Sequence, residues 1–115
     1  MNKNPLLLKG LEEFNNREFF AAHETLEVYW NTVSGDEKEL VQSIIQTAVA
    51  YYHFGRGNYV GARKLLARAV ARAESVDSNT LGIEVSTYLE AIRMSLRGVD
   101  DEKESIEMAT ISFST

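Results

Sequence analysis

The stretch LVQSIIQTAVAYYHF, residues 40–54, decides the expected fold because it is apolar around most of its circumference when it is drawn as a helix. A helix that is hydrophobic nearly all round belongs in the middle of a bundle, enclosed by other helices. Three acidic residues, Asp36, Glu37 and Glu39, stand just before it, where negative charge stabilises the first turn of a helix. We therefore predict a central helix over residues 36–54.

Helical periodicity continues on both sides of this central helix and predicts four more helices. Their approximate ranges are 5–15, 17–33, 58–75 and 81–96. Single glycines, Gly35 and Gly98, are expected to end the second and the fifth helix, because glycine tolerates the left-handed turn that closes many helices. Short connections make consecutive helices antiparallel neighbours. The predicted fold class is thus all-α, a compact bundle of about five mostly antiparallel helices.

One domain is expected over residues 1–115, with a C-terminal tail over residues 98–115. The tail opens with an acidic run and closes on apolar residues, but it has no clear helical pattern. An extra turn, an extended strap and a frayed end all remain open for it.

Composition excludes several classes of function. The chain has no cysteine, so it has no disulfide, no thiolate zinc site and no cysteine nucleophile. No segment approaches the roughly 20 apolar residues of a membrane-spanning helix, so we expect no membrane partner and a cytoplasmic location. Twelve Lys and Arg against seventeen Asp and Glu give a net charge of −5, and nucleic acid is therefore not an expected partner. The one basic stretch, over residues 56–72, is interpreted as a solvated helix face.

Polar residues on helix faces that should be buried form the candidate site. His23 falls in the middle of the apolar arc of residues 17–33, and Glu27 lies one turn further on at its edge, so a direct hydrogen bond between the two is expected. The central helix carries a matching polar line. Gln46 is expected near the level of His23, Gln42 near Glu27, and His53 near Phe19 and Phe20. The predicted cluster is His23, Glu27, Gln42, Gln46 and His53.

Three interpretations of this cluster remain open. It can be a structural network that fixes the register of the helices, a ligand or metal pocket, or a catalytic site. In a metal site, the candidate ligands of a divalent ion are His23, Glu27 and His53; in a catalytic site, His23 and Glu27 act as base and orienting group. Only two histidines are present, which excludes a three-histidine site within one chain. A cluster that opens into a cleft favours an enzyme, and a sealed one favours an interaction module.

A longer series of residues resembles a known bacterial and archaeal family. The series begins with Phe14-Asn15, continues through residues 18–27 (EFFAAHETLE) to Trp30, and resumes with residues 42–46 (QSIIQ), 52–53 (YH), 56–58 (RGN) and 61–62 (GA). It is similar to the family catalogued as domain of unknown function 309, over about residues 14–70. The resemblance implies a compact helical bundle and no established activity. The family pattern includes a histidine, glutamates, a tryptophan and glutamines at the positions of the predicted cluster.

From these observations we expect a small binding or interaction module whose partner is an unknown protein or small-molecule ligand, with a homodimer possible. The alternative is a metal-dependent or acid–base hydrolase that uses His23 and Glu27, with Gln46 and His53 in support. Its cofactor would be a divalent metal.

Overall fold

The computed structural model of this protein describes residues 4–115 and confirms the predicted all-α class. Five α-helices follow one another, with a short 3-10 turn before the last. Their bounds are α1 (Pro5–Asn15), α2 (Phe19–Trp30), α3 (Gly35–Gly55), α4 (Tyr59–Glu74), the 3-10 turn (Thr80–Gly82) and α5 (Val85–Asp100). None of the helices described for residues 4–115 has both the length and the apolar composition that are needed to cross a membrane.

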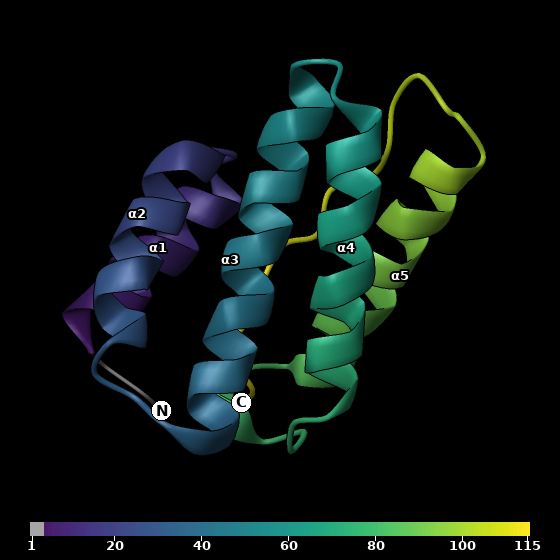
Figure 1. The fold of residues 1–115 in the computed structure, drawn as a ribbon. Coiled ribbons are helices and arrows are strands. Elements are labelled where there is room, and N and C mark those ends of the chain that lie inside the picture. The colour runs from purple at the N-terminus through teal and green to yellow at the C-terminus, as the bar shows by residue number, and fades with distance from the viewer. Residues whose placement is uncertain (1–3) are drawn as a thin grey trace.

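The helices form two layers (Figure 1). The front layer consists of α2, α3 and α4 side by side, with α3 in the middle and antiparallel to both neighbours. Behind it lie α1, α5 and the C-terminal segment, which runs behind α3. Leu40, Ile44 and Tyr51 of α3 are almost completely buried, as the apolar circumference of this segment predicts.

Several predicted helix ends are wrong. The second helix ends at Trp30 and not at residue 33, and Gly35 is the first residue of α3 instead of the end of α2. The second helix begins at Phe19 because Arg17 adopts a left-handed conformation with φ of 63°. The fifth begins only at Val85, after Leu81 takes φ of 59° and interrupts the helical pattern. Gly98 does not end that helix. It is buried inside α5, where the Cβ of any other residue would lie 2.6 Å from the Cγ2 atom of Ile106.

The C-terminal tail is an extended strap, which was one of the three alternatives left open by the sequence. Ile83 and Phe113 form an isolated antiparallel β-bridge. The side chain of Asn15 accepts a hydrogen bond from the Ile111 amide at 2.8 Å and donates one to the Ile111 carbonyl at 2.9 Å. The Ala109 amide donates to the hydroxyl of the buried Tyr51 at 2.9 Å. The strap is therefore held on the back of the bundle by hydrogen bonds between its own backbone and the side chains of Asn15 and Tyr51.

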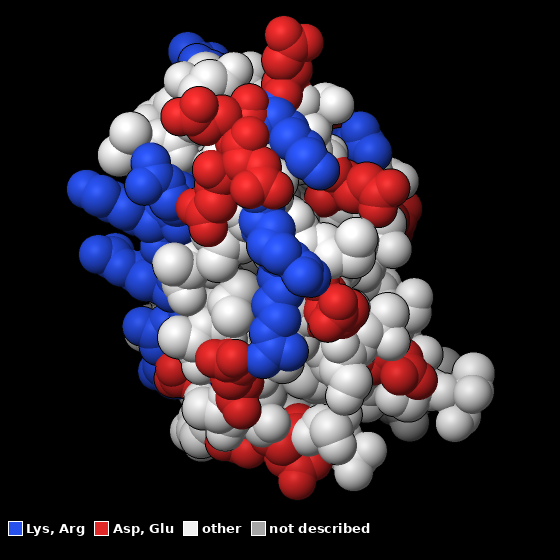
Figure 2. All heavy atoms as spheres, turned by 90° about the vertical axis from the view of Figure 1, so that its right-hand side faces the viewer, with Lys and Arg blue, Asp and Glu red and all other residues white. Residues whose placement is uncertain are grey.

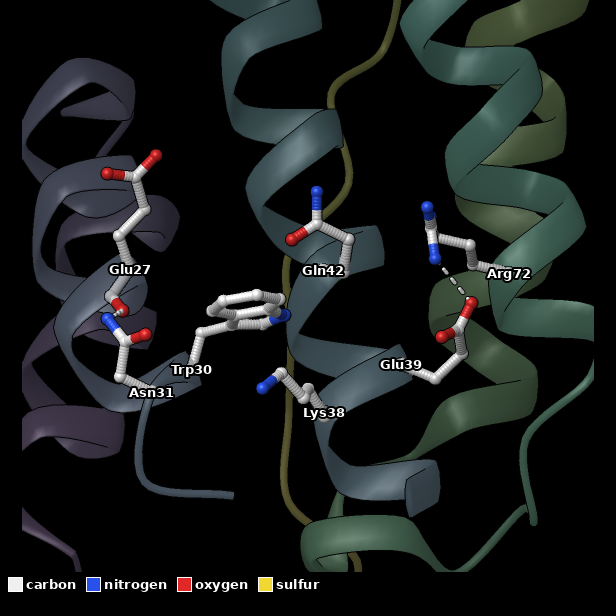
Figure 3. A pocket seen from close by; sticks show the side chains of 7 residues that line it. All are labelled: Glu27, Trp30, Asn31, Lys38, Glu39, Gln42 and Arg72. Atoms are coloured by element: carbon white, nitrogen blue, oxygen red, sulfur yellow. Dashed lines mark hydrogen bonds and ion pairs between the residues drawn. The ribbon is translucent and has the colours of Figure 1, made fainter. Parts of the chain in front are cut away.

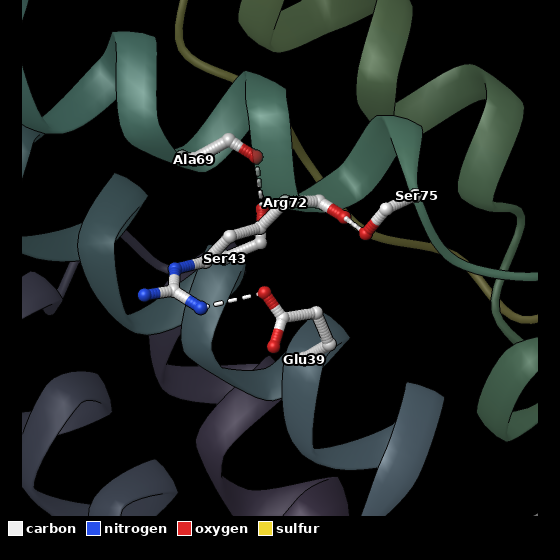
Figure 4. A network of polar contacts seen from close by, with 5 residues as sticks. All are labelled: Glu39, Ser43, Ala69, Arg72 and Ser75. Carbon is white, nitrogen blue, oxygen red and sulfur yellow. Dashed lines mark hydrogen bonds and ion pairs between the residues drawn. The ribbon is translucent and has the colours of Figure 1, made fainter.

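Polar contacts also join α3 to α4 (Figure 4). The buried hydroxyl of Ser43 donates to the Ala69 carbonyl at 2.8 Å. Nearer the surface, the Arg72 guanidinium donates to the Glu39 carboxylate at 2.6 Å. These bonds connect the middle and the lower turns of the two helices, so they fix how α4 lies against α3.

Candidate functional site

The exposed side of the front layer, here called the outer face, carries the residues that the sequence singled out. Its α2 side chains are Phe20, His23, Glu27 and Trp30, together with Glu24, which follows Phe20 by four residues and precedes Glu27 by three and so lies on the same side of the helix. Those of α3 are Lys38, Gln42, Val49, Tyr52 and His53, and those of α4 are Lys64, Arg68 and Arg72. The spacing of four in the α4 set places its three cations on one side of that helix. Arg72 reaches toward α3, so this side belongs to the same face.

An apolar pocket lies at the end of the outer face where α2 begins and α3 ends. Its volume is about 200 Å³, and its lining residues are Phe19, Phe20, His23, Val49, Tyr52 and His53. The ring of Phe20 packs on Tyr52, with centroids 5.6 Å apart, and on His23 at 5.0 Å. Even so, Phe20 is 53% exposed. A large aromatic side chain thus lies over an apolar pocket while half of it contacts solvent.

A wider, polar depression of about 620 Å³ lies at the other end of the outer face (Figure 3). Its walls come from all three helices of the front layer: Glu27, Trp30, Asn31, Lys38, Glu39, Gln42 and Arg72. The Lys38 ammonium lies 3.9 Å from the centroid of the Trp30 ring, a cation–π geometry. Arg72 is held by Glu39, as described above. The depression therefore holds two cations that are already oriented by neighbouring side chains.

The predicted buried pair of His23 and Glu27 is not found. His23 is partly buried, but the Glu27 side chain is 59% exposed, because no helix covers α2 on its outer side. The Nε2 atom of His23 lies 3.7 Å from the Oε1 atom of Glu27, which is longer than a hydrogen bond. Its Nδ1 atom instead lies 2.7 Å from the Phe20 carbonyl oxygen. The expected direct hydrogen bond was therefore wrong, although the two side chains are neighbours.

The five predicted cluster residues lie in three different places. His23 and His53 line the apolar pocket together with Phe19 and Phe20, as the predicted levels imply. Glu27 and Gln42 line the polar depression, also as predicted. Gln46 is buried and lines neither, and its Oε1 atom has no hydrogen-bond partner among residues 4–115. The residues lie on one face but do not form one continuous network.

Metal-ligating side chains are sparse in the part of the chain that the structure describes. Residues 4–115 contain no group of three or more His, Cys, Asp or Glu side chains placed to hold a metal ion together. His23 and His53 share the apolar pocket, and His23 and Glu27 are neighbours, but no third such side chain joins either pair.

Charge is segregated across the outer face, a feature that the sequence analysis missed. Helix α2 carries Glu24 and Glu27 and no Lys or Arg, whereas α4 carries no acidic residue before its last position, Glu74. Figure 2 shows the molecule from the side of α4 and α5, with Lys and Arg side chains projecting along the left-hand edge, which is the front in Figure 1. The sequence contains this signal, but only the side-by-side placement of the helices makes it one surface.

Comparison with known proteins adds a family and relatives without an assigned activity. A family model described as "Domain of unknown function (DUF309)" matches residues 7–65. The uncharacterized protein YpuF of Bacillus subtilis (strain 168) is 36% identical over 87 residues, which cover 72% of this chain and 50% of that protein. An uncharacterized protein of Aquifex aeolicus (strain VF5) is 29% identical over 91 residues, which cover 76% of this chain and 27% of that protein. The chain thus spans half or less of the length of these relatives.

Proposed function

Because this chain belongs to the DUF309 family, whose description names no activity, we propose its function from its own geometry. It is an interaction module that binds a protein partner through the outer face of α2, α3 and α4. The whole face is the contact surface, and the apolar pocket anchors the partner at one end.

The exposed Phe20 at the mouth of the apolar pocket carries this proposal. An aromatic side chain that is 53% exposed and packed on Tyr52 leaves apolar area in water that a partner can cover. Aromatic anchors beside a polar rim are typical of protein–protein interfaces. Here the rim is the adjoining depression, with Trp30, Gln42 and the oriented cations Lys38 and Arg72.

The share of each relative that this chain matches also supports the proposal. The matched segments cover 50% and 27% of the two relatives, so the same helical unit occurs within longer chains there. A unit that recurs in chains of different length is suited to docking onto other parts of proteins.

Site-specific photo-crosslinking in living cells tests the proposed face. The photoreactive amino acid p-benzoylphenylalanine replaces Phe20 in the full chain, and in a matched control it replaces Met94, which is 50% exposed on α5. We expect a discrete crosslinked protein species from position 20 and none from position 94. Position 52 should give the same species as position 20, because Phe20 and Tyr52 are in contact. The proposal fails if positions 20 and 52 give no crosslink, or if position 94 gives the same species.

The alternative function, a metal-dependent or acid–base hydrolase, stays a prediction. By the criterion given above, the opening of His23 and His53 into one pocket is the observation that favours it, whereas the exposed Phe20 over the same pocket favours the interaction module. Elemental analysis of protein purified without chelators or a histidine tag tests the metal-dependent form, with His23→Ala and His53→Ala alongside. About one transition-metal equivalent per chain, lost in His23→Ala, would favour the hydrolase over the interaction module. Protein without metal would remove the metal-dependent form.

A further inference from the structure

We propose that the partner of the outer face is a second copy of this chain, bound so that α2 of each copy lies on α4 of the other. The inference rests on the proposed function, because it assigns the occupant of the same face. The two copies are related by a two-fold axis that runs parallel to α3, and α3 of one copy then lies on α3 of the other.

The distribution of charge on the outer face selects this partner. The α2 edge presents Glu24 and Glu27, and the α4 edge presents Lys64 and Arg68, all on exposed positions. Helix α2 has no Lys or Arg, and no Asp or Glu lies between Lys64 and Arg68 of α4. A face that is acidic along one edge and basic along the other is complementary to itself after a two-fold rotation. Complementary potentials across an interface favour the correct partner and disfavour wrong ones.

The direction of the two-fold axis follows from the same charges. An axis parallel to α3 exchanges the left and right edges of the face, so the acidic edge of one copy meets the basic edge of its mate. An axis that crosses the three helices at right angles would place α2 on α2 and α4 on α4, and like charges would meet. Only the first arrangement brings opposite charges together at both edges.

The positions along the helices match as well. Helices α2 and α4 begin at the same end of the front layer, because both are antiparallel to α3 (Figure 1). Glu24 and Lys64 each lie five residues after the first residue of their helix, so an axis parallel to α3 places them at similar heights. By the same count, Phe20 of one copy meets the start of α4, where Val60 is 56% exposed. Apolar groups therefore meet apolar groups, and charges meet opposite charges.

The size of the face suits a dimer. The molecule measures 37 × 24 × 23 Å, so one long face has an area close to the roughly 800 Å² that each partner buries in an interface of standard size. Two outward-facing residues of α3, Gln42 and Val49, lie near the proposed axis. Each would therefore lie close to its own counterpart in the second copy.

Sedimentation equilibrium of the purified full chain at about 0.15 M salt is the first measurement. We expect a reversible dimer with a dissociation constant in the micromolar range, on the order of 10 µM. The variant Glu24→Lys/Glu27→Lys and the variant Lys64→Glu/Arg68→Glu should each weaken dimerisation about tenfold or more, since like charges then meet at both edges. A matched control, Glu12→Lys/Glu90→Lys, reverses two exposed glutamates on α1 and α5 and should leave the dissociation constant unchanged.

The loss of affinity in each double reversal, followed by its recovery when the reversals are combined, makes the test specific for the α2-on-α4 arrangement. An equimolar mixture of the two charge-reversal variants should form a heterodimer with near wild-type affinity. One chain that carries all four reversals should form a homodimer again, because the edges have exchanged signs. Were α2 to lie on α2, like charges would already meet in the wild-type dimer, so neither double reversal would weaken it and the fourfold variant would show no rescue to measure. All these substitutions are at exposed positions, and circular dichroism of each variant verifies that it is folded.

Disulfide formation checks the position of the axis independently of charge. The chain has no cysteine, so Gln42→Cys introduces one reactive thiol on the outer face. Mild oxidation should link two copies of Gln42→Cys within the dimer, whereas Met94→Cys on α5 should remain largely unlinked.

The outcomes separate this inference from the proposed function. A chain that is monomeric up to about 100 µM overturns the homodimer. If position 20 then still crosslinks to a different protein in cells, the outer face remains an interaction surface and only its occupant is wrong. If position 20 gives no crosslink either, both proposals fail. A dimer that none of the outer-face reversals weakens overturns the arrangement proposed here.

Discussion

Both sides of α3 carry polar side chains, but those of the inner side are buried and paired, whereas those of the outer side are partly open to solvent. On the inner side, the hydroxyls of Ser43, Thr47 and Tyr51 are buried, and each is hydrogen-bonded to the α5 side chains Tyr88 or Ser95. On the outer side, Gln42 and His53 are only partly buried and line two open hollows. Buried and paired groups contribute to the stability of the bundle. Partly exposed groups on an uncovered face contribute little to folding and are available to a partner.

The largest expected effect comes from an inner hydroxyl. Tyr51→Phe removes the acceptor of the buried Ala109 amide as well as the hydrogen bond to Ser95. An orphaned buried donor lowers the free energy of unfolding by about 1–3 kcal/mol. Urea denaturation measures this loss. The neighbouring Tyr52→Phe, on the outer side, is the matched control and should change the same free energy by less than about 0.5 kcal/mol. Equal losses for the two variants would contradict the contrast between the two sides.

A second, smaller effect appears at alkaline pH. Burial raises the pKa of Tyr88 far above its ordinary value, against weaker opposing effects of its hydrogen bonds to Ser43 and Thr47. Above about pH 10 the unfolded chain loses this proton while the folded chain retains it, so stability is complete below that pH and falls above it. Each tyrosine whose pKa is raised by burial makes the free energy of unfolding fall more steeply with pH, by about 1.4 kcal/mol per pH unit.

Tyr88→Phe isolates this contribution. It should make the alkaline loss of stability less steep by about 1.4 kcal/mol per pH unit, as urea denaturation at pH 10–11.5 can measure. At neutral pH the variant should lose only about 1 kcal/mol, because Ser43 and Thr47 keep their backbone acceptors. An unchanged slope would show that the Tyr88 hydroxyl is not buried as described. The same treatment of Tyr51, whose pKa burial also raises, should reduce the slope as well.

The smallest effect is expected on the outer side. His23→Gln should change the free energy of unfolding by no more than a substitution at the surface does, within about 0.5 kcal/mol, and so leave the melting temperature almost unchanged. The reason is that the hydrogen bond, the ring contact and the close carboxylate of His23 all involve residues of its own helix, Phe20 and Glu27, and none of them joins two helices. Differential scanning calorimetry checks this expectation. A drop as large as that of Tyr51→Phe would instead make His23 part of a structural core network.

Hydrophobic periodicity was sufficient to predict the fold class, the level of His53 and the level of Gln42. The apolar circumference of residues 40–54 places that helix in the centre, and α3 is indeed flanked by α2 and α4. Counting from the short connection also located His53 beside Phe19 and Phe20. Helix ends were less predictable, since the left-handed conformations of Arg17 and Leu81 have no strong sequence signal.

By itself, the sequence determined an all-α bundle, its central helix and the set of polar residues that share one face. Those features depend on local periodicity, which the order of residues along the chain encodes directly. Tertiary structure decided that Glu27 is exposed, that Gln46 is buried, and that the tail is a strap hydrogen-bonded to Asn15 and Tyr51. Burial and pairing depend on which distant segment covers a helix face, and here only the inner side of the front layer is covered.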